Sequence, residues 1–578
     1  MNLFSPHARR SLLRRLRHLP LLSFSFSLLV AAALPHADAG AQTSTGPSGG
    51  PPSPDAWGYS THAELMARMR DVAREAPGRA EVRTIGTSRG GREILLLELK
   101  PAGGSTDRSP ALLVAGGVDG RHLAGAELAM RMAEQAARGE GPELSHRLVF
   151  VPLVNPDGYD RAFASPSHLR DGNDHPQDLD RDGLSGEDPF EDLDGNGLIT
   201  WIRVEDPAGG HRIDSDDPRR MVPADFAKGE PATHRVLMEG VDNDGDGSFN
   251  EDGPGGVNID RNFAFEYPIF REASGDYAAS EPETRALMDA LYADPAIYAV
   301  LTFGPGLNLD KAPAGNGGGG ERKITALLPA DRSSVAQAVE LYAEAVKGVS
   351  AAPALPLPGG SFAQTAYYHA GRLSLATPGW WPPAMDGSEA GGSATGVSQG
   401  TDAEERLLAW ADAEGLEISA PWTPVEHPDF PGRKAEAGGI LPFAAWNPPV
   451  SYLEEAAGEH LAFLDALSAR MPDLAFADEK VEPLGNGLYR VTVSVMNRGR
   501  MSTHTEIGDR IRWVERIVTE ISLDRGQSLA AGRPLHLRDA MGPGESQTYS
   551  WLVRGKGTLS VEVRCATTGT RRLAIDLD

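Results

Sequence analysis

The chain has 578 residues, of which 40% are hydrophobic and 24% charged, so it can bury a sizeable core spread over two to four domains. It carries 81 acidic and 55 basic residues, which gives a formal net charge of −26. A charge of this sign and size argues against nucleic acids and anionic membranes as partners and suits cations better.

The first 39 residues have the pattern of a secretory signal peptide. A cluster of arginines is followed by an apolar run over 19–34, and small residues at Ala37 and Ala39 offer cleavage sites. The run is short and interrupted by serines, which favours a cleaved signal over a membrane anchor. We therefore expect a secreted or periplasmic protein with no membrane span after signal removal, and a flexible linker over 40–56.

Helices alternate with strands over residues 57–471, which predicts an α/β domain. Thr61 and Glu64 form a plausible capping box for the first helix. Further elements are expected in this order: strands over 82–85, 94–99 and 111–115, a helix over 126–137, a strand over 148–154, and a closing helix over 453–467. Several of these strands are apolar on both faces, which is typical of a sheet that helices cover on each side.

The last part of the chain, residues 472–578, predicts an all-β sandwich of the immunoglobulin-like kind. One strand places apolar side chains at alternate positions, at Tyr489, Val491, Val493 and Val495. No long helix interrupts the alternating segments, and they contain no obvious chemical motif. We interpret this domain as an accessory module.

An acidic insertion at about 171–253 predicts bound calcium. Cys565 is the only cysteine, so no intramolecular disulfide can form and an exported protein must be stabilised in another way. Three stretches of the insertion place oxygen ligands at positions 1, 3 and 5 and a glycine at position 6, a spacing that folds a tight loop around a hard cation. The predicted ligands are Asp178, Asp180, Asp182, Asp192, Asp194, Asn196, Asp242, Asp244 and Asp246.

None of the three stretches is a complete EF-hand, because Pro189, Arg203 and Gly253 occupy the places of the glutamate expected at position 12. Nearby oxygen atoms could complete the coordination; they belong to Glu187, Asp188, Thr200, Asn250 and Asp252. Three repeats of one spacing favour calcium over an ordinary solvated acidic loop. A structural role is favoured over regulation, since even weak sites stay occupied outside the cell.

Three motifs occur in the order known from one enzyme family: NPDGY at 155–159, GGVNIDRNF at 255–263 and SEPET at 280–284. With these motifs the chain resembles the carboxypeptidase A family of zinc peptidases over roughly 59–470. The resemblance implies a mixed central sheet flanked by helices, zinc as the cofactor, and proteolysis at peptide C-termini. Such an enzyme requires three protein ligands on zinc and a carboxylate that takes the proton of the bound water.

The resemblance also indicates that the zinc site is altered. The family supplies two ligands as His-x-x-Glu after a strand that ends in two glycines, and Asp119 and His122 occupy those places. Both residue types can bind a metal, but Phe303, which stands in place of the third ligand, cannot. The catalytic glutamate matches Gly379, which we favour over the alternative position Glu436.

Three arginines match residues that contact substrate in the family. Arg261 matches the arginine that holds the C-terminal carboxylate of the peptide with two hydrogen bonds, and its neighbour Asp260 stands where the family has asparagine. Arg170 matches the arginine that stabilises the oxyanion, and Arg121 matches another substrate contact. For each arginine the alternative is an ordinary surface salt bridge.

Three functions remain open, in the order in which we favour them. The first is a non-catalytic relative of the carboxypeptidases that binds peptide or protein C-termini, or serves as a scaffold. The second is an active metallocarboxypeptidase in which Asp119 and His122 keep the metal and His369, Asn308 or Asp310 is recruited. The third is a calcium-dependent surface module in which the sandwich carries the binding. Family resemblance determines the fold better than the activity.

Overall fold

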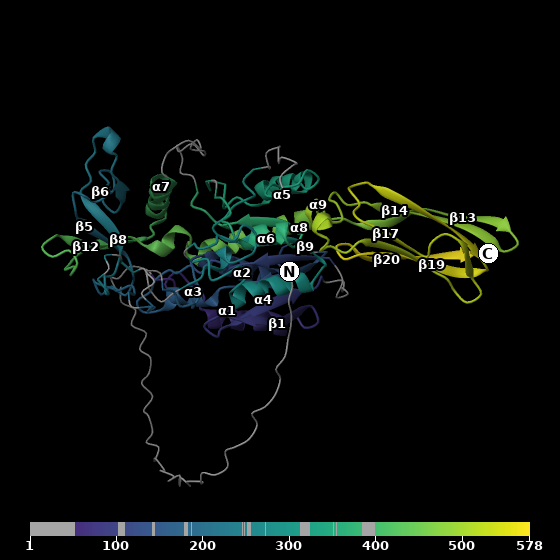
Figure 1. Ribbon diagram of the computed structural model, residues 1–578, viewed down its shortest axis with the longest axis horizontal. Helices are drawn as coiled ribbons and strands as arrows, with labels where there is room; N and C mark the ends of the chain where they lie inside the picture. Colours follow the sequence, from purple (N-terminus) through teal and green to yellow (C-terminus); the bar gives the residue numbers. More distant parts are fainter. Residues whose placement is uncertain are drawn as a thin grey trace, which may run out of the picture. The chain divides into compact units, whose positions relative to one another are not determined.

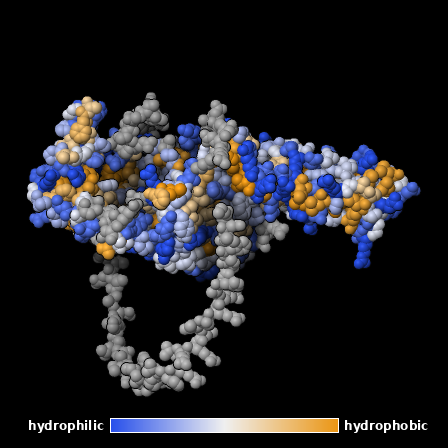
Figure 2. Space-filling view, in the orientation of Figure 1, coloured by the Kyte–Doolittle hydropathy of each residue, from blue (hydrophilic) through white to orange (hydrophobic). Residues whose placement is uncertain are grey.

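The computed structural model describes residues 53–578, apart from 102–109, 142–144, 179–182, 187, 246, 248, 251–255, 272, 312–323, 351, 354 and 384–398. The predicted signal peptide and most of the predicted linker therefore lie outside the described residues. Within the described ranges, no helix is both long and apolar enough to cross a membrane. On the face shown in Figure 2, hydrophobic residues form separate patches among hydrophilic ones.

A six-stranded mixed sheet forms the centre of the α/β domain (Figure 1). Its strands follow the order β1 (Ala80–Thr87), β2 (Glu93–Leu99), β4 (Arg147–Val151), β3 (Ala111–Ala115), β9 (Ile297–Phe303) and β10 (Leu373–Thr377). β1, β2 and β4 pair antiparallel, whereas β4, β3, β9 and β10 are parallel to one another. Every residue of these four parallel strands is buried, as expected of a sheet covered on both faces.

Helices pack on both faces of the central sheet (Figure 1). On one face lie α1 (His62–Glu75), α2 (Leu123–Arg138), α5 (Arg332–Ala345) and α8 (Leu453–Ser468), which share one large hydrophobic core with the strands. On the other face, α4 (Pro282–Ala293) and α6 (Phe362–Tyr368) contribute to a smaller core. The first helix starts at the predicted capping box, where each of the two side chains accepts a hydrogen bond from the other residue's backbone.

The acidic insertion contributes to a second six-stranded sheet, which we had not predicted from the sequence. The strands follow the order β11 (Ser419–Val425), β12 (Ala435–Ile440), β5 (Trp201–Glu205), β8 (His234–Met238), β6 (His211–Ile213) and β7 (Met221–Pro223), and all pairs are antiparallel. β11 and β12 come from a segment much later in the chain than the other four strands. Across the junction, Arg203 of β5 donates a hydrogen bond of 2.7 Å to Glu436 of β12.

Two four-stranded antiparallel sheets form the C-terminal sandwich. One has the order β13 (Leu474–Gly485), β14 (Leu488–Asn497), β18 (Ser546–Arg554), β16 (Ser528–Ala531), and the other the order β17 (Leu535–Arg538), β15 (Ile517–Ser522), β19 (Gly557–Cys565), β20 (Gly569–Leu577). Alternate residues of β14 point into a shared core, as predicted, and Cys565 is a buried free thiol. The predicted fold class, a mixed sheet flanked by helices followed by an all-β sandwich, is confirmed.

Short helices carry two of the motifs. NPDGY forms the start of α3 (Pro156–Asp160), where the side chain of Asn155 accepts a hydrogen bond from the Gly158 N–H at 3.1 Å. The DRNF motif begins within a 3-10 helix, η3 (Ile259–Arg261). The remaining short or peripheral elements are α7 (Gln399–Glu414), α9 (Glu506–Ile511), η1 (Arg161–Phe163), η2 (Phe226–Lys228), η4 (Pro442–Ala445) and η5 (Val450–Tyr452).

Candidate functional site

Asp119 lies in the loop between β3 and α2 and is 2% exposed. Its carboxylate accepts three hydrogen bonds from Arg121: from the backbone N–H at 2.9 Å, from Nε at 3.1 Å and from Nη2 at 2.8 Å. Burial by itself would raise the pKa of Asp119, but the charge and hydrogen bonds of Arg121 outweigh it and the pKa is lowered. Asp119 is therefore an ionised partner of Arg121, with its oxygen atoms already engaged.

His122 is buried at the N-terminal end of α2. Neither ring nitrogen has a hydrogen-bond partner among the described residues. Burial lowers the pKa of His122 to about 4, so the imidazole is neutral near pH 7. A Cβ built at Gly125 would lie 2.9 Å both from Cε1 of His122 and from Cβ of Phe303, so these two side chains flank the first turn of α2.

Phe303 and Gly379 lie against each other. Phe303 is the last residue of β9 and is fully buried, and Gly379 follows β10 with a φ of 77°. A Cβ built at Gly379 would lie 2.9 and 3.0 Å from two ring atoms of Phe303, and closer still to Leu128. The position matched to the catalytic glutamate thus faces the position matched to the third zinc ligand, but no room remains there for a side chain.

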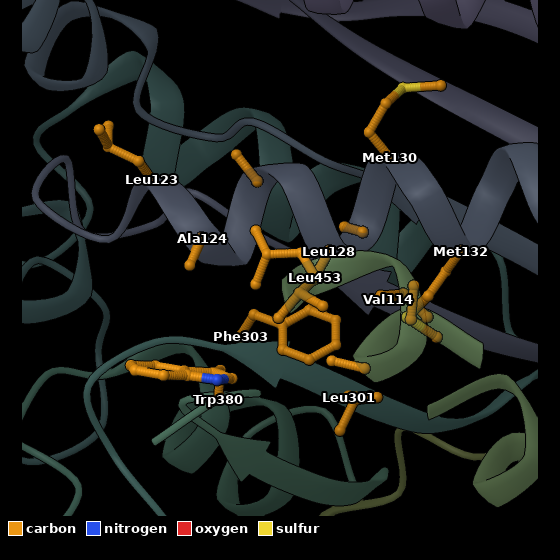
Figure 3. Packing of buried hydrophobic residues seen from close by; sticks show 14 of the residues in the cluster. Val114, Leu123, Ala124, Leu128, Met130, Met132, Leu301, Phe303, Trp380 and Leu453 are labelled. Carbon is orange, nitrogen blue, oxygen red and sulfur yellow. The ribbon is translucent and has the colours of Figure 1, made fainter. Parts of the chain in front are cut away.

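Apolar and aromatic side chains fill the surroundings of Phe303. Figure 3 shows its ring packed with Leu128, Leu453 and Trp380, all members of the large core. His460 of α8, which sequence reasoning did not single out, contacts the same ring at a centroid distance of 5.0 Å. The residues at the matched positions therefore do not fit a catalytic zinc site, since Phe303 supplies no ligand, Asp119 is held by Arg121, and Gly379 supplies no catalytic carboxylate.

His460 belongs to a buried hydrogen-bond network. Its Nε2 lies 3.1 Å from the hydroxyl of Tyr342, which lies 2.5 Å from Oγ1 of Thr377, and its Nδ1 lies 2.7 Å from the Ala456 carbonyl oxygen. Burial lowers the pKa of His460 to about 4. The one sign of this network in the sequence is that His460 is a polar residue on an otherwise apolar face of α8. The network satisfies the ring within the protein, which is the usual state of a core histidine.

Two of the three predicted substrate arginines are engaged by the protein itself. Arg121 binds Asp119 as described above, and its Nη2 lies 3.7 Å from Asp171. Arg170 is buried; its Nε donates to the Gly172 carbonyl at 3.2 Å and its Nη2 to Asp174 at 3.3 Å. Burial lowers the pKa of Arg170 to about 10. Both guanidinium groups therefore already donate hydrogen bonds within the protein.

Arg261 differs from the other two arginines. It is exposed at the end of η3, and its guanidinium has no hydrogen bond or ion pair with a described residue. It lines a cavity of about 460 Å³ together with Pro268, Phe270, Arg271, Pro358 and Gly359. Its neighbour Asp260 points inward and accepts a hydrogen bond from the Phe362 N–H at 2.9 Å. Burial raises the pKa of Asp260 to about 7.

Carboxylates of the NPDGY and SEPET motifs are buried in a structural network. Asp157 accepts hydrogen bonds from the Ser88 hydroxyl at 2.7 Å and from the Gly90 N–H at 2.8 Å. Glu281 accepts from Asn173 at 2.8 Å, and hydrogen bonds to its carboxylate outweigh burial and lower its pKa to about 2. These motif residues fasten loops of the domain together, which explains the motifs without a role in chemistry.

The three acidic stretches share one hydrogen bond between their first aspartate and their glycine. In each, the first aspartate accepts a hydrogen bond from the N–H of the glycine five residues later, at 3.1 Å for Asp178, 2.8 Å for Asp192 and 3.0 Å for Asp242. The three glycines have φ values of 97°, 85° and 95°, a region that favours glycine. Asn196 and Asp244 lie in the described parts of these loops, whereas Asp180, Asp182 and Asp246 lie outside the described residues.

Asp192, Asp194 and Glu239 bring carboxylate oxygens within 4.8 Å of one another, the only such group of three metal-capable side chains within the described ranges. Glu239 directly follows β8, is fully buried, and accepts hydrogen bonds of 2.9 Å from the N–H and hydroxyl of Thr200. Burial raises the pKa of Glu239 and of Asp194. We did not predict Glu239, because it lies outside the repeated spacing and joins the loop only through the fold.

The other predicted candidates lie apart from this cluster. Asp188 is buried and accepts hydrogen bonds from Asn243 at 2.9 Å and from Asn250 at 2.5 Å, so it joins the segment between the first two stretches to the third. Glu187 and Asp252 lie outside the described residues. Asn308 is bonded to the backbone of β10, and His369 is exposed beside Phe265. Asp310 lines a different cavity, of about 380 Å³. Glu436, paired with Arg203, lies in the second sheet.

Part of the α/β domain matches a known family model. Residues 65–216 match the family model described as zinc carboxypeptidase, so the relationship predicted from the motifs is confirmed. Residues 473–576 match a model described as a domain of unknown function. Among curated proteins, human Carboxypeptidase Z is 28% identical over 127 residues, which is 20% of this chain and 20% of that protein. The chain thus matches about a fifth of the length of this relative.

Solved structures match this chain only at low sequence identity and low TM-score. Bovine thrombin-activatable fibrinolysis inhibitor, in complex with tick carboxypeptidase inhibitor, is 12% identical with a TM-score of 0.38; the match covers 71% of this chain and 97% of that one. Carboxypeptidase A from Helicoverpa armigera is 15% identical with a TM-score of 0.36, covering 61% of this chain and 73% of that one. At these scores the similarity carries no argument about function.

Proposed function

We propose that this chain is a secreted, non-catalytic carboxypeptidase-like protein that binds peptide C-termini without cleaving them. The observation that carries the proposal is the packing of Phe303 against Gly379, because it removes both a zinc ligand and the water-activating carboxylate. General-base help of this kind is worth about 10²–10⁴-fold in rate, and the Lewis acid is lost as well.

The binding half of the proposal depends on Arg261. Holding a carboxylate and cleaving a peptide bond use different groups, so one can persist when the other is lost. A guanidinium presents its donors as a rigid fork that matches a carboxylate in two hydrogen bonds. Arg261 lines an open cavity and is not neutralised by a described ion pair. It is therefore the substrate arginine best placed to meet a ligand from solvent.

An active enzyme with a rebuilt metal site is the weaker alternative. It would need a third ligand beside Asp119 and His122, yet His369 is exposed near Phe265 and Asn308 is bonded to the backbone of β10. No group of three metal-capable side chains that includes His122 is found within the described ranges.

The test is a binding assay on the full mature chain with labelled peptides that have free or amidated C-termini. We expect the free peptides to bind more tightly, Arg261→Gln to abolish the difference, and Arg525→Gln, at an exposed turn of the sandwich, to leave it unchanged. Mass spectrometry after incubation should find every peptide at its original length. Binding that ignores amidation would contradict the carboxylate role, and shortened peptides would contradict the non-catalytic role.

We further propose that calcium binds the acidic insertion as a structural cofactor. Two observations favour it: the same aspartate–glycine hydrogen bond closes three loops, and Glu239 adds a buried carboxylate to one of them. Carboxylates held this close repel one another unless a cation lies between them, and hard cations take oxygen ligands. The sandwich then remains an accessory module rather than the main binding surface.

A further inference from the structure

The cavity that contains Arg261 also contains a second arginine, Arg271. Both residues are exposed, and neither guanidinium has a hydrogen bond or ion pair with a described residue. The chain as a whole is strongly acidic, with 81 acidic residues against 55 basic ones. Two cationic side chains that face one hollow without a described carboxylate partner create a local positive potential, which favours an anionic ligand.

Side-chain hydrogen bonds to backbone carbonyl oxygens hold the loop that carries Arg271. Asn262, which is fully buried, donates to the Ser274 carbonyl oxygen at 2.8 Å, and the Ser274 hydroxyl donates to the Pro268 carbonyl oxygen at 2.9 Å. The Tyr267 hydroxyl also donates to the Gly275 carbonyl oxygen. Because these bonds fix the backbone on both sides of Arg271, its position over the cavity is a property of the fold.

Phe270 adds an apolar wall to the same cavity. Its side chain is 96% exposed, and its backbone has a φ of 59°, which is unusual for an aromatic residue. An exposed aromatic ring beside two arginines offers an apolar contact to a bound ligand. The cavity therefore combines two cationic groups with an apolar surface.

We propose that this cavity binds peptides whose C-terminal residue is itself acidic, with Arg271 taking the side-chain carboxylate. The inference rests on the proposed function, because it takes Arg261 as the partner of the terminal carboxylate. A C-terminal glutamate or aspartate presents two carboxylates from one residue, and two arginines in one cavity can receive both. The aliphatic part of that residue and the preceding residue then contact Phe270.

Four labelled peptides of one sequence test this directly on the full mature chain. They end in Glu or Gln, each with a free or an amidated C-terminus, so the two carboxylates are removed separately and together. Because pairs at exposed sites are worth little each, we expect loss of either carboxylate to weaken binding about fivefold. Arg271→Gln should remove the difference between Glu and Gln but preserve the difference between free and amidated ends. Arg261→Gln should do the reverse.

The outcomes separate the two proposals. Equal binding of Glu- and Gln-ended peptides, together with a clear preference for free ends, would overturn the role of Arg271 and leave the proposed function intact. Indifference to amidation would overturn the proposed function itself. Phe270→Ala should weaken all four peptides by a similar factor, and Arg525→Gln, which removes an exposed positive charge from the sandwich, should change none of them. An effect of Arg525→Gln as large as that of Arg271→Gln would reduce the inference to overall charge.

Discussion

The regions around Phe303 and Arg261 were matched from the sequence to positions that act together in the carboxypeptidase family. In this structure the two regions differ in burial, polarity and free space. Around Phe303 the positions are buried, apolar and filled, and even a Cβ at Gly379 would overlap its neighbours. Around Arg261 the cavity is open, and its two exposed arginines have no ion pair with a described residue. Under the proposed function, one fold has closed its reaction centre and gained core packing while keeping an open surface for an anion.

The largest contrast concerns zinc. We expect the mature protein, after saturation with zinc and desalting, to retain well below one equivalent, because a zinc site takes three ligands from the protein and the matched positions do not supply them. Elemental analysis measures this, with a zinc carboxypeptidase as the positive control. If the protein retains one equivalent of zinc and the His122→Ala variant does not, the claim that this region holds no zinc is wrong.

Replacing one phenylalanine in each region compares how much each ring contributes to the free energy of unfolding. Phe303→Ala leaves a cavity in the largest core and should lower the free energy of unfolding by about 3–5 kcal/mol. Phe270→Ala, at a ring that is 96% exposed, should change it by less than about 0.5 kcal/mol. Denaturant unfolding of both variants gives the values. Similar losses for both would mean that the exposed loop is also part of the core.

Calcium should stabilise the protein by a smaller amount. For a site with a dissociation constant of about 10⁻⁴–10⁻³ M, calcium at tenfold to hundredfold excess adds about 1.4–2.7 kcal/mol. Thermal unfolding with calcium and with chelator should show the shift, and Glu239→Gln should reduce it. Asp216→Asn, an exposed acid of the same insertion outside the cluster, is the control. Identical curves with and without calcium would leave these loops as solvated acid.

The smallest effect is a pH dependence at the open region. Since the pKa of Asp260 is about 7, acidification from pH 8 to 6 neutralises a charge beside Arg261 and should tighten binding of a free C-terminus about threefold. Asp260→Asn should bind equally well at both pH values. The folded-state pKa exceeds that of an unfolded aspartate, about 3.9, so this group's contribution to stability falls as pH rises from about 4 to 7 and is constant above. Tighter binding at pH 8 would contradict this.

The central sheet could be predicted because its information is local. Strand 111–115 is apolar throughout and was found with the same bounds, and Thr61 and Glu64 marked the start of the first helix. The second sheet could not be predicted, because its strands are short and two of them come from 419–440. Pairing between distant segments leaves little trace in either segment alone.

The sequence could name candidate site residues, but it could not show which partners those residues have in the folded protein. Motif spacing pointed to Arg261 first and to Arg121 and Arg170 after it, yet only the structure shows that the latter two are held by acidic or carbonyl partners. Substitution at Phe303 was visible in the sequence, whereas its packing against Gly379 depends on how β9 and β10 are placed side by side. Glu239 and Arg271 became candidates only because the fold brings Glu239 to the Asp192–Asp194 pair and Arg271 to the cavity of Arg261.

The pairing of β5 with β12 bears on how the protein matures. Arg203 and Glu436 are separated by 233 positions in the chain, and at synthesis rates of 5–20 residues per second the later strand emerges roughly 12–47 s after the earlier one. During that delay β5 can pair with β8 on one side, but its other edge lacks β12, and long-range pairing is slow even once both strands are present. Acidic side chains near such an open edge disfavour pairing with other chains, so the acidity for which we propose a cation in the finished protein would also protect the unfinished one.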